Sequence, residues 1–354
     1  MFLDTKPFYK NKIEFKQFFA NDSSSHYQQF CDWFQKTLKV EKKFELGQFF
    51  TNDSPFHYQQ FCDWFQKALK VEKKVLEPFA GANDLVKMLS SKWKNCNFVS
   101  YDIDPKNSKV QKKDTLKNFP KNFKIAITNP PWLAKNSAKR KKIFFPKIKQ
   151  DNLYKFCLEK MLKNCEYVAA IIPATFIQSK LYFERLESYT LLPKKIFSET
   201  ENPVCLALFV PKTFKLKTNL FIGKKKIGSY KEILKKIKKN CSPCEKPAIV
   251  KFNVWEGNLG IFTIDSSSKQ NIKFVEPQMI PDNKVKNSSR HIVRIHVTKK
   301  ITKAKIKELN FKLSKIRKDT NDILLSPFKG LMKNGDYRRR ISFSFIRKII
   351  ISTI

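Results

Sequence analysis

Apolar and polar positions alternate in a regular way through the first part of the chain. Short apolar runs have the length of buried strands, and they lie at 75–77, 97–105, 123–128 and 167–172. Between them, apolar residues recur every three or four positions, as in amphipathic helices, most clearly at 56–69, 85–93 and 151–164. Alternating strands and helices indicate an α/β fold, a mostly parallel Rossmann-like sheet with helices on both faces.

Ligands bind such sheets at the carboxyl ends of the strands, and several candidate residues are expected there. The strand "VLE" runs into the turn "PFAGAND", whose small residues around Gly81 let a ligand approach the backbone. The next strand ends in "SYDID", where Asp102 suits ribose hydroxyls. Asp114 and Asn129 follow later strands. This layout is typical of a nucleotide-type site, although a solvated acidic turn before Pro105 would also explain the carboxylates.

The tetrapeptide Asn-Pro-Pro-Trp ends the third strand and suits the recognition of an amine on a flat ring. Asn129 offers a carbonyl acceptor, and the carbonyl of Pro130 offers a second. Successive prolines, Pro130 and Pro131, fix φ and hold both acceptors in place. Trp132 supplies a flat face for stacking. An Asn-Pro turn with incidental neighbours is the alternative.

The N-terminal part contains a tandem repeat. Residues 14–43 and 45–74 are near-copies that differ at six positions. Two copies do not make a solenoid, so a tandem duplication is the simpler explanation. The second copy has Gly47 and Thr51 where the first has Lys16 and Ala20, and it continues directly into the strand at 75–77. We therefore expect the second copy to serve the site and residues 1–44 to add an extra helix.

Charge points to an anionic partner, most simply nucleic acid. The 354 residues carry a formal net charge of +40. Residues 212–354 hold 35 Lys and Arg against 10 Asp and Glu, whereas residues 1–211 hold 36 against 21. Arginine reads guanine edges and also binds phosphate, so Arg338, Arg339 and Arg340 are candidate DNA contacts. A Lys-rich composition and a solvated charge run are the alternatives.

Other features limit the function classes. The eight cysteines are scattered, as in a reduced intracellular protein, and the one close pair, Cys241 and Cys244, lacks the second pair that a zinc site needs. We therefore predict no metal. Met1–Lys12 is polar and charged, and no apolar run is long enough to cross a bilayer, so a cytoplasmic protein without membrane contact is expected.

With these pieces in order, the chain resembles the gamma-class N6-adenine DNA methyltransferases of restriction–modification systems. The resemblance covers roughly residues 45–211 and rests on order and spacing together. The matching segments are "LGQFFTND", "EPFAGAND", "SYDID", "KKDTL" and "NPPW". Two features depart from the family: Asn83 stands where many relatives have a second glycine, and the duplication is not a family feature.

The resemblance implies S-adenosyl-L-methionine as the methyl donor and assigns a role to each matching residue. Residues expected to contact the methionine part of the donor are Thr51, Glu77, Pro78, Ala80 and Gly81. Asp102 would take the ribose hydroxyls, and Asp114 the adenine amine of the donor. Asn129, Pro130, Pro131 and Trp132 would hold the target adenine, flipped out of the duplex, with Phe197 as the second stacking wall. The alternative interpretation is that Phe197 is an ordinary core phenylalanine.

The resemblance also implies a domain plan and partners. Residues 45–211 would form the catalytic domain, and residues 212–354 a smaller basic target recognition domain. Double-stranded DNA is the expected partner, with a separately encoded restriction endonuclease as a possible second one, and a monomer or weak dimer is expected. Two alternatives stay open: an RNA or protein-glutamine methyltransferase, and a DNA-binding pseudoenzyme.

Overall fold

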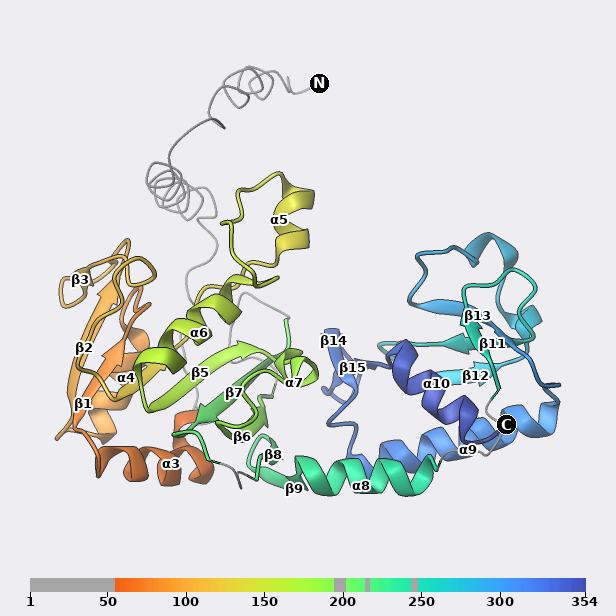
Figure 1. Cartoon of the computed structure of the whole chain (residues 1–354). Coiled ribbons are helices and arrows are strands. Elements are labelled where there is room, and N and C mark those ends of the chain that lie inside the picture. The colour runs from red at the N-terminus through yellow and green to blue at the C-terminus, as the bar shows by residue number, and fades with distance from the viewer. Residues whose placement is uncertain (1–54, 194–201, 214–216, 243–247) are drawn as a thin grey trace, which may run out of the picture.

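A nine-stranded sheet forms the centre of the larger of two lobes (Figure 1). The computed structural model describes residues 55–193, 202–213, 217–242 and 248–354. Across the sheet the strand order is β3-β2-β1-β4-β5-β7-β6-β8-β9. The bounds are β1 Lys74–Glu77, β2 Asn97–Asp102, β3 Gln111–Lys112, β4 Ile125–Thr128, β5 Tyr167–Pro173, β6 Leu186–Leu191, β7 Val204–Phe209, β8 Asn219–Ile222 and β9 Lys225–Ser229.

The sheet is parallel from β3 through β5, and this part carries the candidate site. β2 and β4 both pair in parallel with β1, and β5 pairs in parallel with β4. Beyond β5, the strand β7 runs antiparallel between β5 and β6. The predicted α/β fold with a mostly parallel sheet is confirmed, and so are the predicted strands at 75–77 and 167–172.

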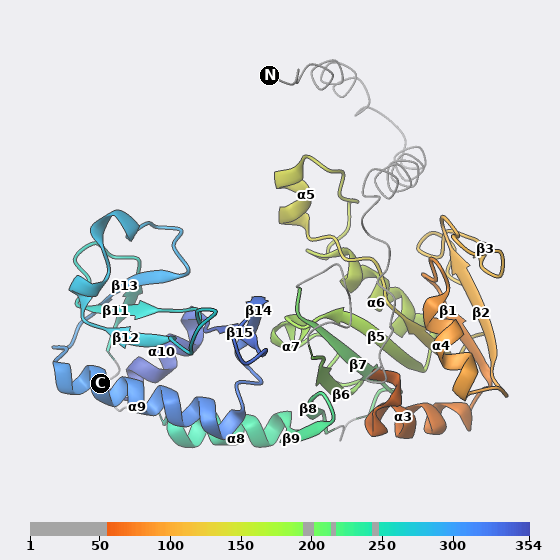
Figure 2. The same ribbon diagram turned by 180° about the vertical axis from the view of Figure 1, so that it is seen from behind.

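Helices cover both faces of the sheet because alternate strand residues point to opposite sides. On one face, α3 (Gln59–Leu69) and α4 (Asp84–Lys92) pack against residues such as Val75 and Ile127. On the other, α6 (Leu153–Asn164) and α7 (Phe176–Ser179) pack against residues such as Leu76 and Ala126. Figure 2 shows α3 and α6 on opposite sides of the strands. A short helix, α5 (Lys135–Lys141), follows the Asn-Pro-Pro-Trp segment.

The helix of the second repeat copy is a core element. Phe61, Trp64 and Phe65 of α3 are almost completely buried. The indole nitrogen of Trp64 donates a hydrogen bond to the carbonyl of Phe209 at 2.9 Å, which ties the helix to β7. The amphipathic helix predicted over 56–69 is confirmed, with a short 3-10 turn at Pro55–His57 before it. The first copy, residues 14–43, lies outside the described residues.

The second lobe is built on an antiparallel sheet of order β10-β13-β11-β12. Its strands are β10 Val250–Phe252, β11 Leu259–Phe262, β12 Lys273–Val275 and β13 Ile292–Val297. Its helices are α9 Lys303–Thr320 and α10 Phe343–Ile351, with α8 Tyr230–Asn240 leading into it from the larger lobe, and 3-10 turns lie at Pro277–Met279 and Asp282–Lys284.

A hairpin links the two lobes. β14 (Ser326–Leu331) pairs antiparallel with β15 (Tyr337–Arg340), and both views place this hairpin between the lobes (Figures 1 and 2). Tyr337 belongs to the core of the large sheet, whereas Arg340 makes a bridge with Ile264 in the smaller lobe. The large sheet itself extends past residue 211, the boundary expected from the sequence, because β8 pairs in parallel with β6. No helix in the described part of the chain is long and apolar enough to cross a membrane.

Candidate active site

The turn after β1 and the end of β2 form one hydrogen-bonded unit. The backbone N–H of Gly81 donates to Oδ2 of Asp102 at 2.8 Å, and the N–H of Asp104 donates to Oδ1 at 2.8 Å. Gly81 has φ +52°, a conformation that glycine adopts without strain. Burial raises the pKa of Asp102, and the two N–H donors oppose that shift. The sequence-predicted residues Gly81 and Asp102 are therefore in direct contact.

Asn83 explains how the turn forms without a second glycine. Its φ is 67°, in the left-handed region where asparagine is the usual substitute for glycine. Its side-chain oxygen accepts a hydrogen bond from the hydroxyl of Ser100 at 2.7 Å, and the residue is buried. Asn83 thus takes the left-handed conformation that leads the backbone into α4.

Glu77 is a buried carboxyl group at the end of β1. Its Oε1 accepts hydrogen bonds from the hydroxyl of Thr128 at 2.5 Å and from the N–H of Phe79 at 3.2 Å. Its Oε2 is buried, and no donor among the described residues reaches it. Burial raises the pKa of Glu77 to about 8, against the effect of the Thr128 hydrogen bond. Thr128 immediately precedes Asn129, so the hydrogen bond joins the ends of β1 and β4.

Asp114 lies at the start of the turn that follows β3. Its Oδ1 accepts from the N–H groups of Leu116 and Lys117, both at 3.0 Å. The adjacent Thr115 donates from its hydroxyl to the carbonyl of Pro78 at 2.9 Å, which fastens this turn to the one after β1. The "KKDTL" and "EPFAGAND" segments are therefore adjacent in space.

The Asn-Pro-Pro-Trp segment leaves the end of β4 between Glu77 and the next strand, β5. Oδ1 of Asn129 is buried, and no donor in the described part of the chain reaches it. Pro130 is buried, whereas Trp132 is partly exposed and packs against the cores on both faces of the sheet. An acceptor of this kind is costly to bury without a partner, by about 1–3 kcal/mol, so it is a candidate ligand-binding group.

An apolar cluster beside these polar groups was not predicted from the sequence. Partly buried Phe79, Ile103, Leu116 and Leu133 pack against Leu153 of α6 and its neighbours. Each of the four lies next to or close to a predicted site residue along the chain, for example Ile103 after Asp102 and Leu133 after Trp132. Their closeness to predicted site residues along the chain is the sequence signal that could have indicated this cluster. The cluster gives this edge of the sheet an apolar wall.

Thr51 and Phe197 lie outside the described residues, as does Cys244. Among the residues that are described, His, Cys, Asp and Glu side chains form no group of three or more that could hold a metal ion.

Of the three consecutive arginines of β15, two point to one side of the strand and one points to the other. Arg338 and Arg340 both lie over the ring of Phe328, with guanidinium carbons 5.4 and 5.9 Å from its centroid. Arg339 points the other way and is only 7% exposed, and burial lowers its pKa. The burial of Arg339 does not favour the predicted DNA contact at that position, because its guanidinium is enclosed by protein. Alternation along a strand is the physical reason.

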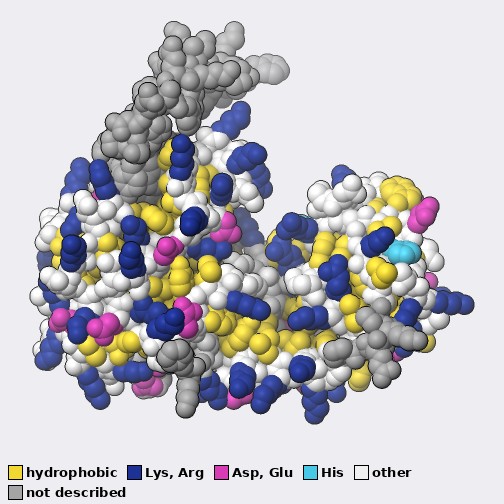
Figure 3. Space-filling view, viewed as in Figure 1, with side chains coloured by type: hydrophobic (Ala, Val, Ile, Leu, Met, Phe, Trp, Pro, Cys, Tyr) yellow, Lys and Arg dark blue, Asp and Glu magenta, His cyan; other side chains and the backbone are white. Residues whose placement is uncertain are grey.

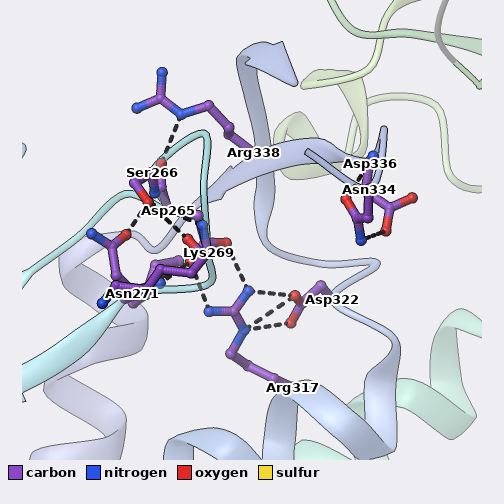
Figure 4. Close-up of polar contacts among 10 residues, drawn as sticks. Asp265, Ser266, Lys269, Asn271, Arg317, Asp322, Asn334, Asp336 and Arg338 are labelled. Atoms are coloured by element: carbon purple, nitrogen blue, oxygen red, sulfur yellow. Dashed lines mark hydrogen bonds and ion pairs between the residues drawn. The ribbon is translucent and has the colours of Figure 1, made fainter. Parts of the chain in front are cut away.

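A buried ion-pair network supports this hairpin (Figure 4). Arg317 of α9 donates to both carboxylate oxygens of Asp265, at 3.0 and 2.7 Å, and also to Asp322 at 2.7 Å. The two carboxylates raise the pKa of Arg317 above its ordinary value, although burial opposes them. The backbone carbonyl of Asp265 in turn accepts from Nε of Arg338 at 2.7 Å. The network therefore fixes Arg338 relative to α9.

Comparisons with known proteins give weak similarity only. No protein-family model matches the chain, and no curated protein matches it. Among solved structures, a type I restriction-modification methyltransferase subunit from Streptococcus thermophilus has 15% identity and a TM-score of 0.37, covering 55% of this chain and 53% of that one. The type I restriction enzyme EcoKI M protein has 16% identity and a TM-score of 0.33, covering 49% and 48%.

A third solved structure is bound to RNA. The catalytic domain of hMettl16 in complex with the MAT2A 3′UTR hairpin 1 has 11% identity and a TM-score of 0.29, covering 46% of this chain and 71% of that one. The chain spans about half the length of the Streptococcus thermophilus subunit and of the EcoKI M protein. At these TM-scores the likeness is too low to assign a function, and the fold class rests on the strand order and the helices on both faces.

Proposed function

We propose that the chain is an S-adenosylmethionine-dependent methyltransferase that methylates the N6 amine of adenine in duplex DNA. The observation that carries this proposal is the buried acceptor Oδ1 of Asn129, which no described donor reaches and which lies at the end of β4. A group with two amine hydrogens on a flat ring is the ligand that it fits, with the carbonyl of Pro130 as the second acceptor.

The proposed chemistry depends on positioning. The exocyclic amine of adenine is a poor nucleophile because its lone pair is delocalised into the ring. Accepting both amine hydrogens at Asn129 and Pro130 favours a pyramidal nitrogen whose lone pair is available. The prolines hold these acceptors rigidly, so little reorganisation is needed when charge develops on the nitrogen. Trp132 and Phe197 are the proposed stacking walls, and the base reaches them by flipping out of the duplex.

The residues around Glu77 fit the methyl donor. S-adenosylmethionine supplies a methyl group on a sulfonium, which is already an activated leaving group. The buried Oε2 of Glu77 is an acceptor suited to the ammonium of its methionine part, beside the turn of Pro78, Ala80 and Gly81 and, as proposed from the sequence, Thr51. Asp102 is proposed to hold the ribose hydroxyls and Asp114 the adenine amine of the donor, against the apolar wall that includes Ile103.

The shape and charge of the molecule support a long anionic substrate. Figure 3 shows a hollow between the two lobes with Lys and Arg side chains on both of its walls. We propose that residues 45–211 together with β8 and β9 form the catalytic domain, and that the remainder of residues 212–354 is the target recognition domain, in which Arg338 and Arg340 face the DNA. A partner endonuclease would be a separate chain.

The test is transfer of a labelled methyl group from S-adenosylmethionine to duplex DNA, structured RNA and protein, compared in one assay. Transfer to DNA supports the proposal. Transfer to RNA or protein alone would identify one of the other methyltransferases, and cofactor binding without transfer would indicate a pseudoenzyme.

A further inference from the structure

The lining of a depression on the smaller lobe includes four cationic side chains. Its lining includes Lys284, Lys286 and Arg290 from the segment before β13, together with Ser288, His291 and, from β15, Arg340. Lys284, Lys286 and Arg290 are exposed, whereas Arg340 is half-buried. The lining therefore brings two segments of the chain together around one concave surface.

No carboxylate in the described part of the chain neutralises this surface. Lys284, Lys286, Arg290 and Arg340 form no ion pair with a described acid. Acids close to these residues in the chain or in the sheet have other partners: Asp282 pairs with Arg294 at 2.7 Å, and Asp265 pairs with Arg317. Asp336, just before β15, accepts a hydrogen bond from the side-chain amide of Asn334 at 2.8 Å. Burial lowers the pKa of Arg340, and the nearby Arg290 lowers it further. Like charges are thus held together at some cost, which a bound anion would remove.

The backbone holds both sides of the depression in place. The N–H of Thr263 donates to the carbonyl of His291 at 2.9 Å, and its hydroxyl donates to the carbonyl of Arg290. The next residue, Ile264, forms an antiparallel bridge with Arg340. Thr263 and Ile264 therefore hold the segment before β13 and the strand β15 at a fixed distance from each other, so the site is preorganised.

A ring orders the cationic side chains further. Phe328 of β14 lies under the guanidinium groups of Arg338 and Arg340, and the imidazole of His291 meets the same ring edge-on at 5.8 Å. Arg338 is also anchored through its Nε to the carbonyl of Asp265. Ordered arginines lose less conformational freedom on binding an anion than free ones do.

We propose that this depression, lined by Lys284, Lys286, Ser288, Arg290, His291 and Arg340, binds a backbone phosphate of the nucleic-acid substrate. Guanidinium groups and hydroxyls match the oxygens of a phosphodiester, and the contact carries no base preference. Because β15 also belongs to the core of the large sheet through Tyr337, a phosphate held here is fixed relative to the catalytic lobe. The inference rests on the proposed function, since it names the substrate of that function.

The test uses the full chain and a fluorescent duplex. The pocket variant is Lys284→Ala/Lys286→Ala/Arg290→Ala, and the control variant is Lys231→Ala/Lys235→Ala/Lys239→Ala on α8, which lies along the edge of the molecule away from the hollow (Figure 1). All six side chains are exposed, so both variants should fold, and the change in net charge is the same. Affinity is measured over a series of salt concentrations, and S-adenosylmethionine binding and Tm are measured for each variant.

The pocket variant should bind the duplex at least about tenfold more weakly. The slope of log affinity against log salt should fall by roughly 0.9 for one lost phosphate contact, whereas the control stays within about threefold of wild type. Equal weakening in both variants would overturn this inference and leave the proposed function intact. Wild-type protein that binds neither duplex DNA nor structured RNA would overturn both, and binding to structured RNA alone would overturn the proposed function.

Discussion

At the scale of single residues, buried acceptors without donors mark the candidate site. Oδ1 of Asn129 and Oε2 of Glu77 are both buried, and no donor among the described residues satisfies either. Each carries a desolvation cost of about 1–3 kcal/mol, which a ligand with suitable N–H groups would offset. The two groups lie at the ends of neighbouring strands and are joined through Thr128.

Substitution of Asn129 should separate methyl transfer from donor binding. Asn129→Ala is expected to lower the transfer rate by about 100-fold or more, because a preorganised group at the reacting amine is lost. Its affinity for S-adenosylmethionine, measured by calorimetry, should stay close to wild type. Asp102→Ala is the matched contrast, expected to weaken the donor and spare duplex affinity. Near-normal transfer by Asn129→Ala would remove the Asn-Pro-Pro-Trp segment from the active site.

Donor binding should depend on pH through Glu77. Burial raises the pKa of Glu77 to about 8, so below that pH the free protein holds the carboxyl group protonated. A bound ammonium favours the carboxylate, so binding releases a proton and affinity should rise with pH, by up to about tenfold per unit between roughly pH 6 and 7.5.

Calorimetry in buffers of different ionisation enthalpy measures that proton release directly. Glu77→Gln cannot titrate and should show a flat profile with weaker binding. A wild-type profile as flat as that of Glu77→Gln would show that Glu77 is not ionised by the donor.

At the scale of elements, the duplicated segment offers a matched pair of substitutions. In the second copy, Trp64 is buried against the sheet and donates to the carbonyl of Phe209. Trp64→Ala should lower the free energy of unfolding by about 3–5 kcal/mol. Trp33 is the same residue in the first copy, and Trp33→Ala should have little effect, because α3 already occupies that face of the sheet.

Urea unfolding followed by circular dichroism compares the two tryptophan variants. Deleting residues 14–44 should likewise leave methyl transfer intact. Equal destabilisation by Trp33→Ala and Trp64→Ala would show that both copies are structural, and loss of transfer on deletion would place the first copy in the active site.

The sequence predicted the helices and strands better than it predicted which strands pair and which side chains are buried. β1, β4 and β5 and the helices α4 and α6 follow from local periodicity, and so does the glycine turn that brings Gly81 to Asp102. The membership of β8 and β9 in the large sheet does not, because pairing with β6 depends on residues far away in the chain. The burial of Arg339 could not be predicted either, since its neighbours Tyr189 and Asp322 come from distant segments.

At the scale of the whole molecule, two basic surfaces face one hollow. α5, which follows the Asn-Pro-Pro-Trp segment, ends in Lys139, Arg140 and Lys141. The hairpin between the lobes carries Arg338 and Arg340 on β15. Figure 3 shows Lys and Arg side chains on both walls. A duplex lying in the hollow would contact both lobes at once and would release many counterions.

Duplex affinity of the wild-type protein should therefore fall steeply with salt. With several phosphates contacted, a loss on the order of 1,000-fold is expected between 50 and 200 mM salt, linear on logarithmic axes. Fluorescence anisotropy with a labelled duplex measures it, with an uncharged dextran as the control for viscosity. An affinity that hardly changes with salt would contradict binding through the phosphate backbone.

The most direct test of the central claim is the identity of the methylated product. Duplex DNA is incubated with the wild-type protein and methyl-labelled S-adenosylmethionine, digested to nucleosides and analysed by mass spectrometry, with Asn129→Ala in parallel. Label is expected in N6-methyladenine with wild type, and at least about 100-fold less of it with Asn129→Ala. Label in another nucleoside, or equal label with both proteins, would contradict the claim.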